Sequence, residues 1–157
     1  MQTRRPVVLL VEDDPAIGTL VSRRLQERYE LVVATNDRAA LAHLRTLGDK
    51  IHAVLMDLQL IGSTLDGLAL IRLIRGKLPP DQTPDYARGI AALPVPVFIV
   101  SADPDAVTED QKKELAIDGA MPKPIDFRFL ALCLAQASIH HAVAHLEPAG
   151  SRKGVAR

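Results

Sequence analysis

The feature that most constrains this chain is a fivefold alternation of short apolar runs with amphipathic helical patterns. Residues 7–11 are apolar at every position, as in a strand that is buried on both faces. Asp14 and Pro15 then supply a helix N-cap and a first-turn proline. Five strand–helix units in a row predict an α/β fold, a doubly wound five-stranded parallel sheet with helices on both faces. The expected strands are 7–11, 31–33, 53–56, 97–100 and 120–121, and the expected helices are 15–28, 37–47, 67–75, 104–116 and 126–146.

Length and composition limit the chain to one domain and to few classes of partner. The 157 residues are 48% hydrophobic and 24% charged, which suits a single folded core. Because 19 Lys and Arg residues balance 19 Asp and Glu residues, no basic excess favours nucleic acid or an anionic membrane as a partner. No apolar run is long enough to span a membrane, and a single cysteine excludes an internal disulfide, so we expect a cytoplasmic protein. We expect a domain over residues 1–146, with an insertion at about 76–96, and a flexible tail over 147–157.

Chemically active side chains follow four of the five expected strands. The carboxyl ends of parallel strands meet at one edge of a sheet, where such folds place their functional sites. Glu12 and Asp13 follow the first strand, and Asp57 follows the third. Ser101 follows the fourth strand and Lys123 the fifth. Carboxylates within ~4 Å repel each other by roughly 4 kcal/mol at an effective dielectric of 20, so the three acids require a cation. An all-oxygen ligand set indicates Mg²⁺ or Mn²⁺.

A metal ion, an ammonium group and a hydroxyl at one edge suit phosphoryl transfer. Together they would stabilise the equatorial oxygens of a phosphoryl group in transfer. Asp57 is the natural nucleophile, because it ends a central apolar strand and can form an acyl phosphate. Taken singly, Asp14 is a helix cap, Ser101 a turn residue and Lys123 a solvated charge. Their joint placement at strand ends argues against that simpler interpretation for the site as a whole.

Five short motifs follow one another along the chain: VLLVEDDP at 8–15, VLMDLQL at 54–60, LDG at 65–67, VFIVSA at 97–102 and PKPID at 122–126. In this order they resemble the receiver domain of two-component response regulators, over about residues 6–146. The resemblance implies the flavodoxin-like receiver fold and a phosphoryl acceptor rather than an enzyme. Because the residues after 146 are too few for an effector domain, we expect output by protein–protein contact or by phosphate relay to a histidine phosphotransfer protein.

The resemblance also implies a Mg²⁺ site. Asp13 would bind the ion directly and Glu12 through water. Asp57 would be a further ligand, and Gln59 would offer its backbone carbonyl.

Three residues take roles in phosphoryl transfer by the same resemblance. Asp57 corresponds to the phosphoacceptor, which receives its phosphoryl group from a sensor histidine kinase or a histidine phosphotransfer protein. Ser101 corresponds to the switch hydroxyl that follows the phosphoryl group. Lys123 corresponds to the phosphate-binding lysine, and the peptide bond before Pro124 is expected to be cis.

Three departures from the family pattern bear on function. The loop at 60–65 is longer than usual and lacks the usual proline. The insertion at 76–96 is either a tolerated surface segment or a partner contact. Ala120 stands three residues before Lys123, where the family has its switch aromatic. Without a ring there, the alternative is a pseudo-receiver, an interaction or dimerisation module in which phosphorylation is vestigial.

The last expected helix carries two apolar stripes on nearly opposite sides. One stripe suffices to pack on the sheet, so the second predicts a homodimer or another protein partner, unless the insertion folds over it. The inner stripe is Phe127, Leu130, Leu134, Ala137, His141 and Ala144, and the outer stripe is Phe129, Leu132, Gln136, Ile139, Val143 and Leu146.

Overall fold

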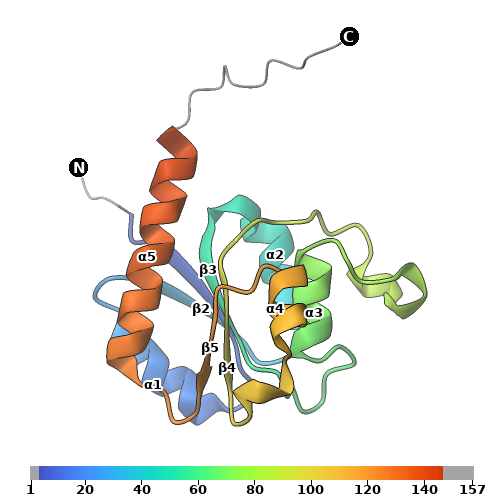
Figure 1. Cartoon of the computed structure of the whole chain (residues 1–157), viewed down its shortest axis with the longest axis horizontal. Coiled ribbons are helices and arrows are strands. Elements are labelled where there is room, and N and C mark those ends of the chain that lie inside the picture. The colour runs from blue at the N-terminus through green and yellow to red at the C-terminus, as the bar shows by residue number, and fades with distance from the viewer. Residues whose placement is uncertain (1–3, 147–157) are drawn as a thin grey trace.

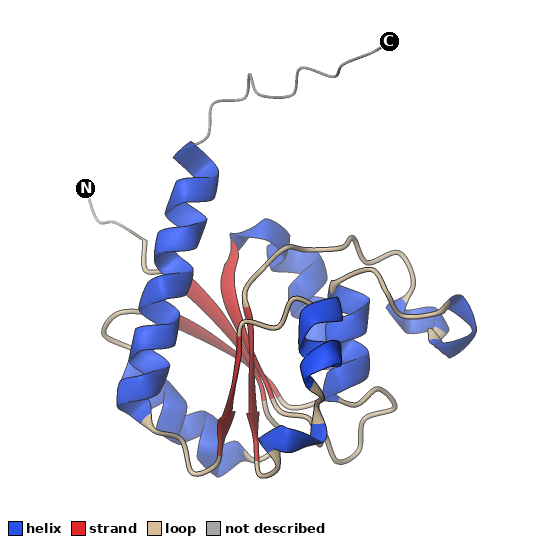
Figure 2. Ribbon diagram, in the orientation of Figure 1, coloured by secondary structure: helices blue, strands red, loops and turns tan. Residues whose placement is uncertain are grey.

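The computed structural model describes residues 4–146, which form one parallel five-stranded sheet with helices on both faces (Figures 1 and 2). The strand order is β2-β1-β3-β4-β5, which confirms the predicted doubly wound sheet. The tail expected over 147–157 lies outside the described residues. The strands are β1 (Val7–Val11), β2 (Glu30–Ala34), β3 (Ile51–Met56), β4 (Val97–Ser101) and β5 (Gly119–Pro122), and the helices are α1 (Pro15–Leu25), α2 (Asp37–Leu47), α3 (Gly67–Ile74), α4 (Glu109–Glu114) and α5 (Phe127–Leu146).

The sheet divides the core into two layers, because successive strand residues point to opposite faces. Leu9 and Val54 pack in the layer that contains α2 and α3. Leu10 and Leu55 pack in the layer that contains α1 and α5. All four side chains are buried, which explains why the central strands are apolar at every position. Among the described residues, none of the helices combines the length and the apolar character of a membrane span.

Side-chain caps determine where the helices begin. Asp14 caps α1 by accepting a hydrogen bond from the Ala16 N–H, as the sequence predicted. The prediction of one helix over 104–116 is wrong. Asp103 precedes only a 3₁₀ turn, and α4 begins after Thr108, which forms a reciprocal capping box with Gln111. The first helix also ends at Leu25 rather than at residue 28.

The insertion at 76–96 packs on the layer of α2 and α3. It contains two 3₁₀ turns, and its buried Ala87 belongs to that layer of the core. The Arg45 guanidinium of α2 donates to the carbonyl of Tyr86, and the Leu93 N–H donates to the carbonyl of Ile74 in α3. The body of the insertion therefore leaves the outer stripe of α5 uncovered, and only its last residues, such as Pro94 and Pro96, come near Gln136 and Ile139 of that stripe.

Helix α5 packs on the sheet through its inner stripe. Leu130, Leu134 and Ala137 are buried, as predicted. His141 contacts the ring of His52 in β3, with 4.0 Å between the ring centroids. The side chains of residues 144 and 146, which were predicted to continue the two stripes, lie outside the described part of the chain.

Candidate functional site

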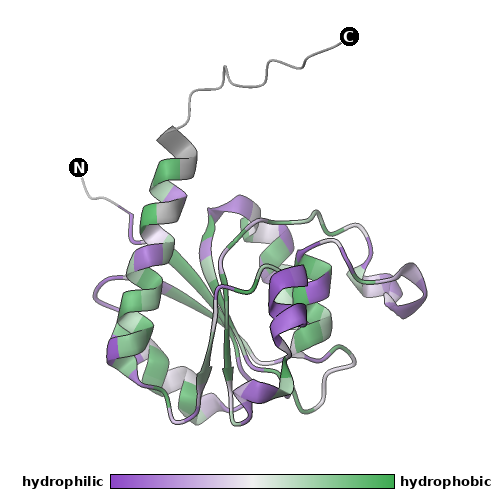
Figure 3. Cartoon of the chain, viewed as in Figure 1, coloured by the Kyte–Doolittle hydropathy of each residue, from purple (hydrophilic) through white to green (hydrophobic). Residues whose placement is uncertain are grey.

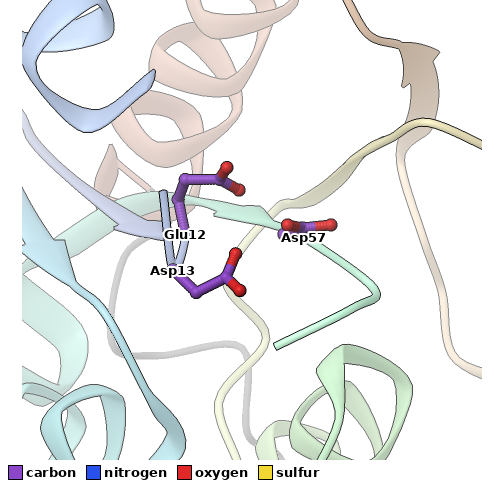
Figure 4. Close-up of side chains that lie close together, drawn as sticks. All are labelled: Glu12, Asp13 and Asp57. Atoms are coloured by element: carbon purple, nitrogen blue, oxygen red, sulfur yellow. The ribbon is translucent and has the colours of Figure 1, made fainter. Parts of the chain in front are cut away.

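Three carboxylates meet at the carboxyl end of the sheet, as the sequence predicted (Figure 4). Glu12 and Asp13 directly follow β1, and Asp57 directly follows β3. The two strands pair in parallel, with Val11 beside Met56, so the residues after them are neighbours. One carboxylate oxygen from each acid lies within 4.8 Å of the others. Glu12 and Asp57 are only 2% and 5% exposed, so the charges are held close together out of water.

Lys123 neutralises part of this negative charge. Its Nζ lies 3.0 Å from both carboxylate oxygens of Glu12 and 3.0 Å from Oδ2 of Asp57. The backbone N–H of Lys123 donates to the carbonyl of Ser101, which continues the pairing of β4 with β5. The peptide bond between Lys123 and Pro124 is cis, as expected.

Burial sets the protonation of the cluster. Burial, together with the neighbouring Asp57 carboxylate, raises the pKa of Glu12 to about 7, against the opposing effect of Lys123. Burial by itself lowers the pKa of Lys123, but hydrogen bonds to Glu12 and Asp57 outweigh it and raise the pKa of the ammonium group. The lysine therefore stays charged while Glu12 exchanges a proton near neutral pH.

The chain packs tightly around Asp57. The Asp57 N–H donates to the carbonyl of Val11, and the Gln59 N–H donates to Asp57 Oδ1 at 3.2 Å. A Cβ added to Gly67 would lie 1.9 Å from the carbonyl oxygen of Asp57. Only glycine fits there, which explains the glycine of the LDG motif.

Ser101 and Gln59 take their expected places in the chain. Ser101 is buried at the end of β4, next to the central strand, and its Oγ accepts a hydrogen bond from the Asp103 N–H at 3.2 Å. Gln59 is exposed two residues after Asp57. The role of its carbonyl as a metal ligand stays a prediction.

The loop at 60–65 is anchored on both sides of the site. The Ile61 N–H donates to Asp13 Oδ2 at 3.0 Å. The Leu65 N–H donates to Oδ2 of the buried Asp37, and the Asp37 N–H donates to Ser63 Oγ. The loop therefore connects the acidic cluster to the start of α2.

Asp37 is a residue that the sequence analysis missed. It also accepts a hydrogen bond from the Tyr86 hydroxyl of the insertion. Burial by itself raises the pKa of Asp37, but hydrogen bonds, first of all from Tyr86, outweigh it and lower the pKa. In the sequence, Asp37 looks only like a second possible cap directly after Asn36, which caps α2. Nothing near it in the sequence indicates that its partner is Tyr86, 49 residues away.

Three acids, a lysine and a buried hydroxyl at one sheet edge suit the binding of a divalent metal ion and a phosphoryl group. The carboxylate oxygens that lie together are the donor set that Mg²⁺ prefers. The Lys123 ammonium group lies beside the Asp57 carboxylate. In that position it can also form a charge-assisted hydrogen bond to a phosphate oxygen.

Comparisons with known proteins agree with this arrangement. AruR, a transcriptional regulatory protein of Pseudomonas aeruginosa, is 40% identical over 74 residues, which cover 45% of this chain and 30% of AruR. This chain thus matches less than a third of that relative. A sensor protein from Polaromonas sp. JS666 shares 27% identity and a TM-score of 0.64, over 87% of this chain and 98% of that one. The non-phosphorylated HemR receiver domain from Leptospira biflexa has the same fold, with 23% identity and a TM-score of 0.61, over 85% and 94% of the two chains.

The family model described as the response regulator receiver domain matches residues 8–134, which include the acidic cluster and Lys123. Since this match covers most of the chain, the protein belongs to the response regulator receiver domain family.

Proposed function

We propose that this chain accepts a phosphoryl group on Asp57 in a Mg²⁺-dependent reaction. The donor is the phosphohistidine of a sensor histidine kinase or of a histidine phosphotransfer protein. The observation that carries this proposal is the Lys123 ammonium group, 3.0 Å from Asp57 Oδ2 inside the acidic cluster.

The transfer exchanges one bond to phosphorus for another. A carboxylate oxygen of Asp57 attacks the phosphorus atom, and an O–P bond forms as the P–N bond to the donor imidazole breaks. The imidazole nitrogen keeps the electron pair of that bond and takes up a proton. Lys123 pairs with a phosphoryl oxygen, so the charge that moves onto Asp57 stays compensated.

The remaining site residues hold the metal ion and the product. Asp13, Glu12, Asp57 and the carbonyl of Gln59 would bind Mg²⁺. When bound, the ion supplies positive charge beside the phosphoryl oxygens. The Ser101 oxygen accepts the Asp103 N–H, so its own hydroxyl hydrogen can be donated to a phosphoryl oxygen.

We place the domain within residues 1–146 and its activity in the cytoplasm, where the free thiol of Cys133 stays reduced. The chain acts as a phosphoryl acceptor, not as an enzyme with a separate substrate. Its output is contact with protein through the outer stripe of α5, which the structure leaves exposed.

Intact-mass measurement tests the phosphoacceptor directly. With Mg²⁺ and acetyl phosphate, the wild type should gain the mass of one phosphoryl group, and chelation of the metal should abolish the gain. Asp57→Asn keeps the side-chain shape but removes the nucleophile, so it should gain nothing. Asp14→Asn is the matched control, because Asp14 is an exposed helix cap next to the site. A phosphorylated Asn variant would disprove the role of Asp57, and an inert wild type would support a pseudo-receiver instead.

A further inference from the structure

The outer stripe of α5 remains uncovered in the folded domain. Its large apolar side chains are well exposed: Phe129 45%, Leu132 65%, Ile139 64% and Val143 53%. The helix cannot turn to hide them, because its inner stripe is fixed in the core and His141 contacts His52 on β3. Figure 3 shows broad green bands on α5, interrupted by pale and purple ones, in contrast to the mostly purple α4. This face is therefore available to a partner outside the domain.

The charge of this face distinguishes between kinds of partner. The sequence contains no Asp, Glu, Lys or Arg between Arg128 and Glu147. By contrast, the exposed surface of α1 carries Arg23 and Arg24. A two-fold axis brings each residue near its own symmetry mate, so charges close to the axis would repel each other. The outer stripe carries none of these four residue types, so two copies of it can approach each other without that repulsion.

The exposed apolar side chains supply part of the area that an interface with a second copy of the chain would bury. The exposed parts of the four large side chains amount to roughly 400 Å² per copy, about half of the ~800 Å² that each partner buries in a standard interface. Two exposed small residues on one flank of the stripe, Ala135 and Ala142, let the partner helix approach closely.

A hollow beside the stripe adds to the same surface. It has a volume of about 820 Å³ and is lined by Gln136 and Ile139 of α5, together with Pro94, Pro96 and Phe98, and the acids Asp49 and Asp118 also line it, away from the stripe itself. Side chains from the outer stripe of an apposed α5 helix can enter this hollow. The same surface therefore offers both protruding side chains and a space to receive them, as a well-packed interface between two copies needs.

From these observations, we infer that two copies of this chain associate through the outer stripes of their α5 helices, about a two-fold axis. This inference extends the proposed function, because it names the partner of α5. The dimer is tested on the unphosphorylated protein. The dimer can therefore be absent while Asp57 is phosphorylated, and Asp57 can stay unphosphorylated while the dimer forms.

Sedimentation of the pure chain tests this inference. Between about 1 and 500 µM, the wild type should shift from one to two copies of its 17.0 kDa chain by mass action. The double substitution Leu132→Glu with Ile139→Glu should weaken association by about 100-fold or more. The matched control is Leu20→Glu, because Leu20 is an exposed leucine on α1, outside the stripe.

Each contrary outcome is informative. Circular dichroism and thermal unfolding confirm that the variants are folded, which we expect because both substituted side chains are mostly exposed. A wild type that stays monomeric over the whole range overturns the inference, whether the stripe then binds another protein or a lipid vesicle. A double variant that still forms dimers, or a Leu20→Glu variant that loses them, places the interface elsewhere and also overturns it.

Discussion

Replacing Lys123 with methionine should destabilise the folded domain strongly, although the two side chains are similar in length. The Lys123 Nζ lies 3.0 Å from oxygens of both Glu12 and Asp57. At this distance and an effective dielectric of 20, each pair attracts by roughly 5 kcal/mol. The lysine side chain is 20% exposed, which screens part of this attraction. Loss of one partner of a buried ion pair costs about 3–5 kcal/mol, and we expect a loss of about 3 kcal/mol at pH 8 without Mg²⁺.

The loss should depend on pH, through Glu12. Its pKa is about 7 in the folded state, against a reference value of 4.5. The folded state therefore binds the proton more tightly, and stability falls as the pH rises from about 4.5 to about 7. Lys123 lowers the pKa of Glu12, so its removal raises that pKa further and extends the fall to higher pH. The variant should thus lose less stability at pH 6 than at pH 8, and Mg²⁺ should offset part of the loss.

Urea unfolding followed by circular dichroism measures these differences. The matched control is Lys112→Met, because Lys112 Nζ also lies 3.0 Å from a carboxylate oxygen, that of Glu109. The Glu109 side chain is 80% exposed, so the control should lose at most about 1 kcal/mol. The reasoning is refuted if Lys123→Met loses no more stability than Lys112→Met at pH 8, or if its loss is the same at both pH values.

Three shorter predictions address the metal site and the packing around it. Asp13→Asn should weaken Mg²⁺ binding by about 10-fold or more, and Asp14→Asn should leave it nearly unchanged; calorimetric titration would show equal affinities if Asp13 is not a ligand. Gly67→Ala should cost about 3 kcal/mol or more, because its Cβ would lie 1.9 Å from a backbone oxygen at the end of β3, and an unchanged melting temperature would contradict this. Tyr86→Phe should cost about 1.5–3 kcal/mol in urea unfolding through the lost hydrogen bond to Asp37, and a loss below about 0.5 kcal/mol would show that this bond is dispensable.

The sheet could be predicted from the sequence because its strands are buried on both faces. Every residue from Val8 to Val11 is buried, and such a run has few other structures open to it. The fourth helix shows the limit of this approach. The prediction began this helix after Asp103 and overlooked Thr108, although Thr108 and Gln111 have the spacing of a capping box. The structure uses Thr108, because its capping box with Gln111 satisfies two backbone N–H groups at once.

The candidate site also has a part that could be predicted from the sequence and a part that could not. Glu12, Asp13 and Asp57 could be placed together because each directly follows a strand, and the ends of parallel strands meet. The hydrogen bond between Asp37 and Tyr86 could not be predicted. It joins residues 49 positions apart, and it depends on the path of the insertion, for which no periodic pattern exists.

These contacts bear on how phosphorylation would be transmitted in a chain that has Ala120 at the switch position. Ala120 pairs with Ile99 in the sheet, and a methyl group has no alternative rotamer that could differ between two states. Only contacts that differ between states can shift an equilibrium. The loop at 60–65 has such contacts, because the Asp13 carboxylate that would bind Mg²⁺ already accepts the Ile61 N–H. Since the same loop hydrogen-bonds to Asp37, amide exchange with and without Mg²⁺ and beryllofluoride should change in this loop more than around Ala120.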